Sequence, residues 1–266
     1  MTTDYQQTIA DWQARRFEHL TAEDGWLNVI GRYWLEDGVA RIGSAADNDI
    51  ILPTGPARLG TITQAPGKLV FQPEAAGQAA VVLTPDAANP PKFSVGSLRF
   101  EVTTMDGRNA LRARDADAPE RASFKGLSYF PTDPAWRIVA EWSRLDQPIT
   151  AGIDTVAGIP STVQITHKAA FTHAGQRFAL LPTHGTAQKP QFVLRDLTAK
   201  SETYGASRFV YGEAVSEGEG SIVLDFNKAF NPPCAFTDHA VCPLPPPENI
   251  LPFRIEAGEK KPGYGS

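Results

Sequence analysis

The sequence predicts an all-β protein with one N-terminal helix: a small β-sandwich, then an antiparallel β-meander or barrel covered by a proline-rich arm. Short runs rich in branched and aromatic residues, separated by turn residues, recur from residue 25 to residue 226. No helix-length periodic segment follows residue 22, which disfavours an α/β architecture. The segment 226–251 has too many prolines for a helix or central strand, yet too many large apolar side chains for a disordered tail.

Residues 4–20 are expected to form the single helix, within an N-terminal segment 1–24. Asp4 is a suitable N-cap, and Gln7 follows three residues later as in a capping box. An isolated helix of this length is only marginally stable in water. We therefore expect it to dock on a β domain through Trp12 and Phe17.

Residues 25–115 are expected to form the sandwich, because short strands follow one another at close spacing. Its strongest local signal is a hairpin in which Leu98–Thr103 and Ala110–Arg114 are joined through Asp106-Gly107. The polar stretch that begins at residue 115 is typical of a linker and predicts a domain boundary.

Residues 121–266 are expected to form the second β domain. Turn-like segments separate its strands, and such short connections favour an antiparallel meander, either closed as a barrel or folded as a sandwich. The expected strands are Arg137–Trp142, Ser161–Thr166, Ala169–Thr172, Arg177–Pro182, Gln191–Asp196, Ala206–Tyr211 and Ser221–Phe226.

Composition limits the classes of partner. Of the 266 residues, 42% are hydrophobic and 21% charged, which is the balance of a globular protein, and the net charge is only −5. A nucleic-acid partner is not expected, because no basic run is present to neutralise phosphates. The first residues lack a signal-peptide pattern and no stretch is apolar enough to cross a membrane, so we expect a cytoplasmic protein without a membrane partner.

Two C-terminal stretches carry a family resemblance. They are Asp225-Phe-Asn-Lys-Ala-Phe-Asn-Pro-Pro-Cys-Ala-Phe236 and Cys242-Pro-Leu-Pro-Pro-Pro-Glu-Asn249. Together they resemble the signature of a bacterial and archaeal family known only as a domain of unknown function. The resemblance implies a family and leaves the activity open.

A second, local resemblance concerns residues 41–53. The run Arg41-Ile-Gly-Ser-Ala-Ala-Asp-Asn-Asp-Ile-Ile-Leu-Pro53 is similar to the opening strands of forkhead-associated domains, β-sandwiches that bind phosphothreonine peptides. Ser44 stands where that family has Arg, and Ala57-Arg58-Leu59-Gly60 replaces its Ser-Arg and His pattern. A phosphate would lose its charge-assisted hydrogen bonds here, so the resemblance implies the sandwich and not phosphopeptide binding. A plain β-turn at residues 47–49 explains the same residues.

A polar ligand pocket is predicted beneath the proline-rich segment 231–249, which we call the arm. Alternation along the strands places Arg208 opposite Phe209, and Asp225 and Asn227 opposite Phe226. If the aromatic faces pack on the core, the polar side chains point outward or into a barrel mouth. The alternative is a solvated face with an ordinary surface ion pair. The candidate ligand-binding residues are Glu202, Tyr204, Arg208, Asp225, Asn227, Asn231, Cys234, Glu248 and Asn249.

Several of these residues have a structural interpretation as well. Asn227, Asn231 and Asn249 can satisfy backbone groups in the proline-rich region. Glu248 can anchor the arm or act as a base, and the anchor is favoured. The aromatic residues Trp26, Tyr33, Trp34, Trp136 and Trp142 can form a stacking platform but are more typical of a core.

Thiol and metal chemistry are weaker alternatives. Cys234, His239 and Cys242 have a spacing that matches no standard zinc motif. An additional ligand would have to come from His167, His173 or His184, which are distant in sequence. A catalytic thiol at Cys234 would have His239 nearby in sequence but no helix N-terminus to activate it. Motifs for a serine hydrolase and for nucleotide phosphates are absent from the sequence. We therefore expect neither cofactor nor metal, and packing by two free thiols.

The function favoured by the sequence is binding of a small polar or anionic ligand under the arm. An enzyme, hydrolytic or redox, that uses the same pocket with a Cys/His centre is the alternative. A scaffold that binds a protein partner through the sandwich is the third reading, and nothing in the sequence speaks against a protein partner.

Overall fold

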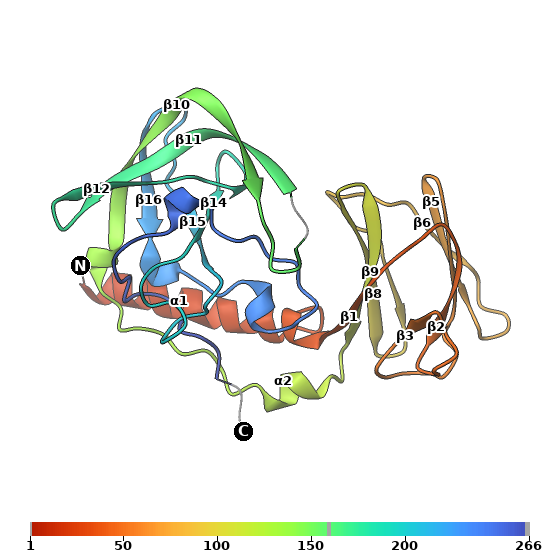
Figure 1. The fold of residues 1–266 in the computed structure, drawn as a ribbon. Coiled ribbons are helices and arrows are strands. Elements are labelled where there is room, and N and C mark those ends of the chain that lie inside the picture. The colour runs from red at the N-terminus through yellow and green to blue at the C-terminus, as the bar shows by residue number, and fades with distance from the viewer. Residues whose placement is uncertain (1, 159–160, 264–266) are drawn as a thin grey trace. The chain divides into compact units, whose positions relative to one another are not determined.

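The structure, a computed structural model, describes residues 2–158 and 161–263 (Figure 1). The chain divides into two compact units. Residues 20–124 form one, which we call the sandwich unit. Residues up to His19 together with the chain from Lys125 onward form the other, the sheet unit. The domain bounds expected from the sequence, 1–24, 25–115 and 121–266, stay a prediction.

The sandwich unit consists of two packed sheets. One has four strands in the order β1-β9-β8-β7, and the other has five in the order β3-β2-β4-β5-β6. All pairs are antiparallel except β2 with β3. The strands are β1 (Val29–Trp34), β2 (Gly38–Gly43), β3 (Ile50–Ile51), β4 (Gly60–Ala65), β5 (Lys68–Pro73), β6 (Val81–Leu83), β7 (Lys92–Val95), β8 (Leu98–Met105) and β9 (Arg108–Asp115); a 3₁₀ turn η1 (Trp26–Asn28) precedes them and a short helix α2 (Pro119–Ser123) follows.

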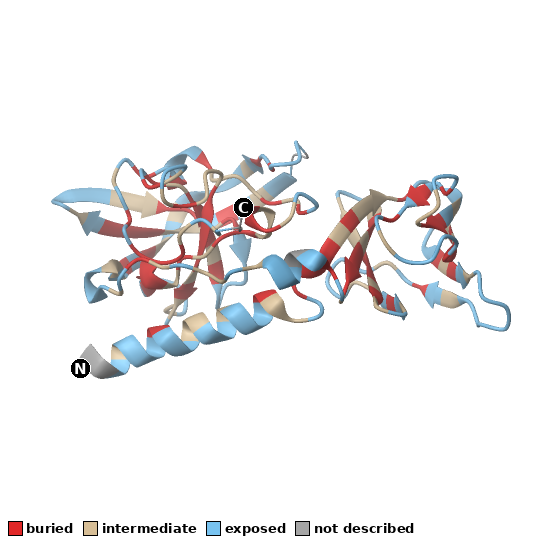
Figure 2. Ribbon diagram, turned by 90° about the horizontal axis from the view of Figure 1, so that it is seen from below, coloured by how far each residue is buried: buried red, intermediate tan, exposed pale blue. Residues whose placement is uncertain are grey.

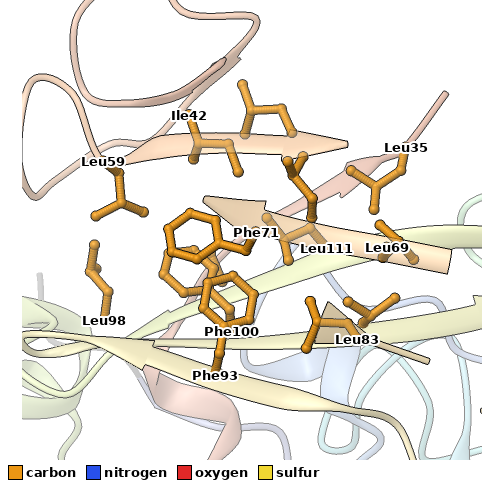
Figure 3. Close-up of a cluster of buried hydrophobic side chains, with 14 of the residues drawn as sticks. Leu35, Ile42, Leu59, Leu69, Phe71, Leu83, Phe93, Leu98, Phe100 and Leu111 are labelled. Atoms are coloured by element: carbon orange, nitrogen blue, oxygen red, sulfur yellow. The ribbon is translucent and has the colours of Figure 1, made fainter. Parts of the chain in front are cut away.

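Side chains from both sheets fill the space between them (Figure 3). Phe93 lies at the centre, with its ring stacked 4.4 Å from that of Phe71 and 4.8 Å from that of Phe100. The predicted hairpin is present, because Asp106 and Gly107 both take positive φ, 49° and 71°, between β8 and β9. Kinship with forkhead-associated domains stays a prediction.

The sheet unit contains one seven-stranded antiparallel sheet in the order β12-β11-β10-β16-β15-β14-β13. Two meanders, β10–β12 and β13–β16, meet where β10 pairs with β16. Residues 161–172, expected as two strands, form one continuous strand. The strands are β10 (Arg137–Ile153), β11 (Ser161–His173), β12 (Gln176–Leu180), β13 (His184–Gly185), β14 (Pro190–Leu194), β15 (Arg208–Glu213) and β16 (Gly220–Asp225); a 3₁₀ turn η2 (Pro134–Trp136) precedes β10.

This sheet is curled rather than flat. Two strands separate β10 from β14, so a flat sheet would place them roughly 14 Å apart. Trp142 of β10 nevertheless contacts Phe192 of β14 edge to face, with ring centroids 6.4 Å apart. Phe171 of β11 likewise lies 6.1 Å from Phe226. The core of the unit therefore lies inside a half-barrel, whose ends are open to turns and to the arm.

Helix α1 (Thr2–Thr21) packs on the sheet unit along part of its surface, and the rest of the helix is exposed (Figure 2). Trp12 contacts Tyr129 edge to face at 6.4 Å, as expected for a docking residue. Arg16 forms an ion pair of 2.8 Å with the buried Glu259. Phe17 is 44% exposed, and its part in docking stays a prediction. The ion pair of Arg16 adds a polar docking contact, which a search for apolar periodicity does not reveal.

The arm is ordered, and the described structure shows no helix longer than a 3₁₀ turn and no strand in it. Its turns are η4 (Pro233–Ala235) and η5 (Pro247–Asn249), after η3 (Phe226–Lys228) at the end of β16. Just before the arm, Phe230 forms a two-way backbone bridge with Phe209 of β15, at 2.8 and 2.9 Å. This bridge pairs the chain just before the arm with the edge of β15, and the Phe230 ring contacts those of Phe209 and Tyr211.

The predicted fold class, all-β with one N-terminal helix and antiparallel sheets, is confirmed. Within the described residues, none of the helices combines the length and the apolar character that crossing a bilayer requires.

Candidate functional site

An open cleft of about 660 Å³ lies at one end of the half-barrel in the sheet unit. Its volume falls within the usual range for small-molecule sites, and barrel mouths commonly hold such sites. Strands β10 and β11, the segment before β14 and the β15–β16 turn form its walls. The residues that line it are Trp142, Arg144, Val163–His167, Pro182–Gln188, Pro190 and Val215–Gly218.

The floor of the cleft is aromatic. Trp142 is 4% exposed, and its ring stacks on that of His167 at 4.9 Å with an interplanar angle of 9°. Cross-strand register explains this contact, because Arg144 pairs directly with His167 while Trp142 lies two residues earlier on the same face of β10. Trp142 is almost fully buried under His167, so the half-buried His167 ring is the surface of the pair against which a ring or a planar polar group can stack.

The two histidines of the cleft are held in similar ways. Nδ1 of His167 shares a hydrogen bond of 2.8 Å with Oγ1 of Thr166, and Nδ1 of His184 shares one of 2.9 Å with Oγ1 of Thr183. Within the described residues neither Nε2 atom has a partner, so each is available to a ligand as donor or acceptor, depending on the tautomer. Although the His184 side chain is exposed in the cleft, neighbouring atoms displace part of its water and lower its pKa. A neutral imidazole therefore faces the cleft at neutral pH.

The cleft also has charged groups. Arg144 lies on its wall, and its guanidinium forms no ion pair with any described residue. The backbone N–H of Arg144 donates to Glu219 at 3.1 Å, which ties β10 to the β15–β16 turn. Glu217 of that turn supplies the negative charge in the lining. One cation, one carboxylate and two imidazoles make this a mixed polar rim over an apolar floor.

A glycine fixes the shape of one wall. Gly185 has φ of 84°, and a Cβ there would come within 2.8 Å of the backbone nitrogen of Gln191. Only glycine fits this turn without displacing β14. The turn places His184 and Thr186 at the rim.

The sequence-predicted site residues lie elsewhere. Arg208 and Val210 share a strand face opposite Phe209, as alternation predicted. That face packs in the core, so Arg208 is buried inside the unit and does not point outward or into a barrel mouth. The guanidinium of Arg208 donates to Asp196 at 2.6 Å and to the carbonyls of Ala257 and Ile255 at 2.5 and 3.0 Å. The structure shows no direct contact between Arg208 and Asp225.

Asp225 and Asn227 belong to a polar network beneath α1. Tyr5 donates to Oδ1 of Asp225 at 2.8 Å and accepts from Nδ2 of Asn227 at 3.0 Å. Asn227 also bonds the backbone N–H and carbonyl of Asp133, at 3.0 and 2.8 Å. Burial, and then Asp225, raise the pKa of Tyr5, so its hydroxyl stays protonated and acts as a donor.

Tyr204 and Asn231 tie the arm to the rest of the unit, whereas no described contact of the Glu248 side chain anchors the arm as the sequence had favoured. Tyr204 donates to the carbonyl of Cys234 at 2.9 Å, and Glu202 pairs with Arg254. Nδ2 of Asn231 donates to the carbonyl of Lys260 at 2.7 Å. Glu248 is exposed in η5.

Asn249 is fully buried and makes three hydrogen bonds of 2.8 Å with the backbone. One comes from Leu181 N–H, and two go to the carbonyls of Leu181 and Val193. The expectation that Asn227, Asn231 and Asn249 satisfy backbone groups is confirmed. A ligand-binding role for the nine predicted residues stays a prediction.

Neither Cys234 nor Cys242 is in a disulfide. His239 is exposed, and its backbone N–H donates to Thr237. Over the described ranges, no three or more His, Cys, Asp or Glu side chains are grouped so that they could hold a metal ion.

Sequence reasoning did not find the cleft. It assigned Trp142 to the core and considered His167 and His184 only as distant metal ligands. A usable signal was the alternation along 163–167, which places Val163, Ile165 and His167 on one face. That this face lines an opening depends on the curl of the sheet, which no local pattern predicts.

Comparison with known proteins places the sheet unit in a family. The model described as "Protein of unknown function (DUF1684)" matches residues 122–260. The chain belongs to this family. The resemblance to a domain of unknown function is thus confirmed at the level of the family, and the cleft lies wholly inside the region that defines DUF1684.

A solved structure is also similar. It is the solution NMR structure of an uncharacterised protein of Haloarcula marismortui, 30% identical over 53% of this chain and 80% of that one, with a TM-score of 0.43. No curated protein matches the chain.

Proposed function

We propose that this DUF1684 protein binds a small polar or anionic ligand in the cleft formed by Trp142, His167, His184 and Arg144. The observation that carries the proposal is the stack of Trp142 and His167 on the floor of an open 660 Å³ cleft with free polar groups at its rim. An apolar floor with a few convergent polar groups is the usual composition of a ligand site.

Each rim group has a definite role in this proposal. Arg144 supplies charge-assisted hydrogen bonds to a carboxylate or phosphate. The neutral His184 supplies one donor or acceptor without adding a charge. Glu217 disfavours ligands of high negative charge, because it lies in the same lining. A ligand with one anionic group and a flat apolar part fits this combination best.

The proposal keeps the ligand class that the sequence suggested and changes its location. Under the arm, Arg208 already donates to a carboxylate and two carbonyls, which leaves Nε as its free donor. In the cleft, the guanidinium of Arg144 has no partner among the described residues. We also propose a cytoplasmic location, which agrees with the two free thiols. An enzyme built on Cys234 and His239 has less support, because no contact joins them in the described part of the chain.

The test is thermal unfolding of the full chain with inorganic phosphate, benzoate and indole-3-acetate as probes. At roughly ten times the dissociation constant, a bound probe should raise Tm by about 3 °C or more. Arg144→Ala and His184→Ala should remove at least half of that shift. Arg15→Ala, a substitution on the exposed side of α1, is the matched control and should keep it.

Two results would reject the proposal. One is that none of the three probes shifts Tm of the unmodified protein. The other is a shift that survives unchanged in both Arg144→Ala and His184→Ala, which would place the anion elsewhere.

A further inference from the structure

The arm brings its two cysteines together with one tyrosine. The backbone N–H of Cys234 donates to Sγ of Cys242 at 3.2 Å, although seven residues separate the two in sequence. The hydroxyl of Tyr204 donates to the carbonyl of Cys234 at 2.9 Å. All three lie within the sheet unit and away from the cleft.

The two thiols differ in access. Cys234 is half-buried, whereas Cys242 is 2% exposed. A small solute can therefore reach the sulfur of Cys234, while Cys242 is shielded from solvent and faces its partner. This asymmetry is typical of a pair in which one thiol reacts first and the other resolves the product.

The surroundings also activate Cys234. The thiol of Cys242, and then the hydroxyl of Tyr204, hold the pKa of Cys234 below its ordinary value against the opposing effect of burial. The thiolate is the nucleophilic form of cysteine, so this environment favours reaction at Cys234.

We propose that Cys234 and Cys242 are a reversible dithiol–disulfide site, in which Cys234 reacts first with hydrogen peroxide and Cys242 resolves the product. The Cys234 thiolate attacks one peroxide oxygen, an S–O bond forms, the O–O bond breaks, and the released hydroxide takes a proton to give water. Cys242 then attacks the sulfur of the Cys234 sulfenic acid. The S–S bond forms, the S–O bond breaks, and the hydroxide leaves with the thiol proton of Cys242 as a second water.

In total, the two thiols lose two electrons, and these reduce one hydrogen peroxide to two waters. A dithiol such as dithiothreitol reverses the disulfide by exchange. The product closes a short loop within the arm and fixes Pro243 and its neighbours relative to η4. The site is independent of the ligand cleft, so either proposal can fail without the other.

The experiment treats the full chain with a small excess of hydrogen peroxide and follows its intact mass and free thiols. The unmodified protein should lose about 2 Da and both free thiols while it stays a monomer, and dithiothreitol should restore them. Cys242→Ser should stop at a sulfenic acid about 16 Da heavier, which dimedone traps. Cys234→Ser should consume peroxide at least about 10-fold more slowly, because Cys242 is shielded.

The variants also report on folding. Under reducing conditions, Cys234→Ser and Cys242→Ser should keep the far-UV circular dichroism of the unmodified protein. If either one unfolds, mass mapping of peptides from the unmodified protein still decides the question. An internal 234–242 link supports the proposal. Intermolecular dimers, two free thiols after treatment, or equal rates for Cys234→Ser and Cys242→Ser overturn it.

Tyr204 acts in this proposal as a positioning residue. Tyr204→Phe removes the hydroxyl that favours the Cys234 thiolate, so the pH at which the oxidation rate rises should increase. The final disulfide should still form. A purely structural role would leave that pH profile in place.

Discussion

The guanidinium of Arg208 lies 2.6 Å from the carboxylate of Asp196, and both side chains are 1% exposed. Asp196 also accepts from the backbone and hydroxyl of Thr198 and from the backbone of Ile255. Arg208 therefore connects β15 to the segment that carries Ile255 and Ala257 through the interior of the unit. Loss of one partner would leave the other charge buried and uncompensated.

Arg208→Ala should accordingly lower the free energy of unfolding by about 3–5 kcal/mol. Arg177→Ala is the control, because it removes an exposed arginine that pairs with Glu141. This substitution should change the free energy of unfolding by only about 0–1 kcal/mol. Urea unfolding followed by circular dichroism measures both. A loss below about 1 kcal/mol for Arg208→Ala would show that the buried pair does not hold the sheet unit together.

Asn249 should be the most sensitive position in the arm. Asn249→Ala removes three hydrogen bonds and leaves buried groups of Leu181 and Val193 without partners, so we expect a loss of about 3 kcal/mol or more. Asn89→Ala, at an exposed loop position, is the control and should change stability little. Equal melting temperatures for the two variants would contradict this role.

Gly258 should tolerate no side chain. It has φ of 78°, and a Cβ there would lie 2.7 Å from the carbonyl oxygen of Phe226. Gly67 has a similar φ of 70° with open space around it, so Gly67→Ala reports conformational strain alone. We expect roughly 1 kcal/mol for Gly67→Ala and a clearly larger loss for Gly258→Ala. Similar losses would mean that Ala229 and Phe226 can move apart at no cost.

Stability should depend on pH through His184. Because its pKa is lowered in the folded state, the unfolded chain binds the proton more readily. The resulting stability is present above a pH of about 6.5, the ordinary pKa of histidine, and is lost as pH falls through the lower folded value. His184→Gln should make the fall in Tm between neutral and mildly acidic pH shallower. An unchanged slope would show that the cleft does not shield this imidazole.

Sequence reasoning reached the fold class and many strands, because alternation and turn chemistry act locally. The Asp106-Gly107 hairpin and the backbone role of Asn249 are of this kind. The face that carries Arg208 was expected to point outward, and this was wrong because the strand is buried on both sides: Val210 packs in the core, while Phe209 and Tyr211 contact Phe230. Where both faces of a strand are covered, alternation does not tell which face is the core.

The cleft was missed for a different reason. Trp142, His167 and His184 come together only when the sheet curls enough to bring β10 near β14. The curl is a property of the whole seven-stranded sheet. The composition and residue spacing of single strands therefore do not predict the curl.

The central claim is that a small anion binds beside His167 and His184. Its most direct test is to titrate the ¹⁵N-labelled protein with inorganic phosphate, benzoate and indole-3-acetate in turn and follow the imidazole signals of all five histidines by NMR. Binding in the cleft predicts saturable shifts at His167 and His184, with His19 and His239 unchanged. Shifts confined to other histidines, or none at all with any of the three anions, would contradict it.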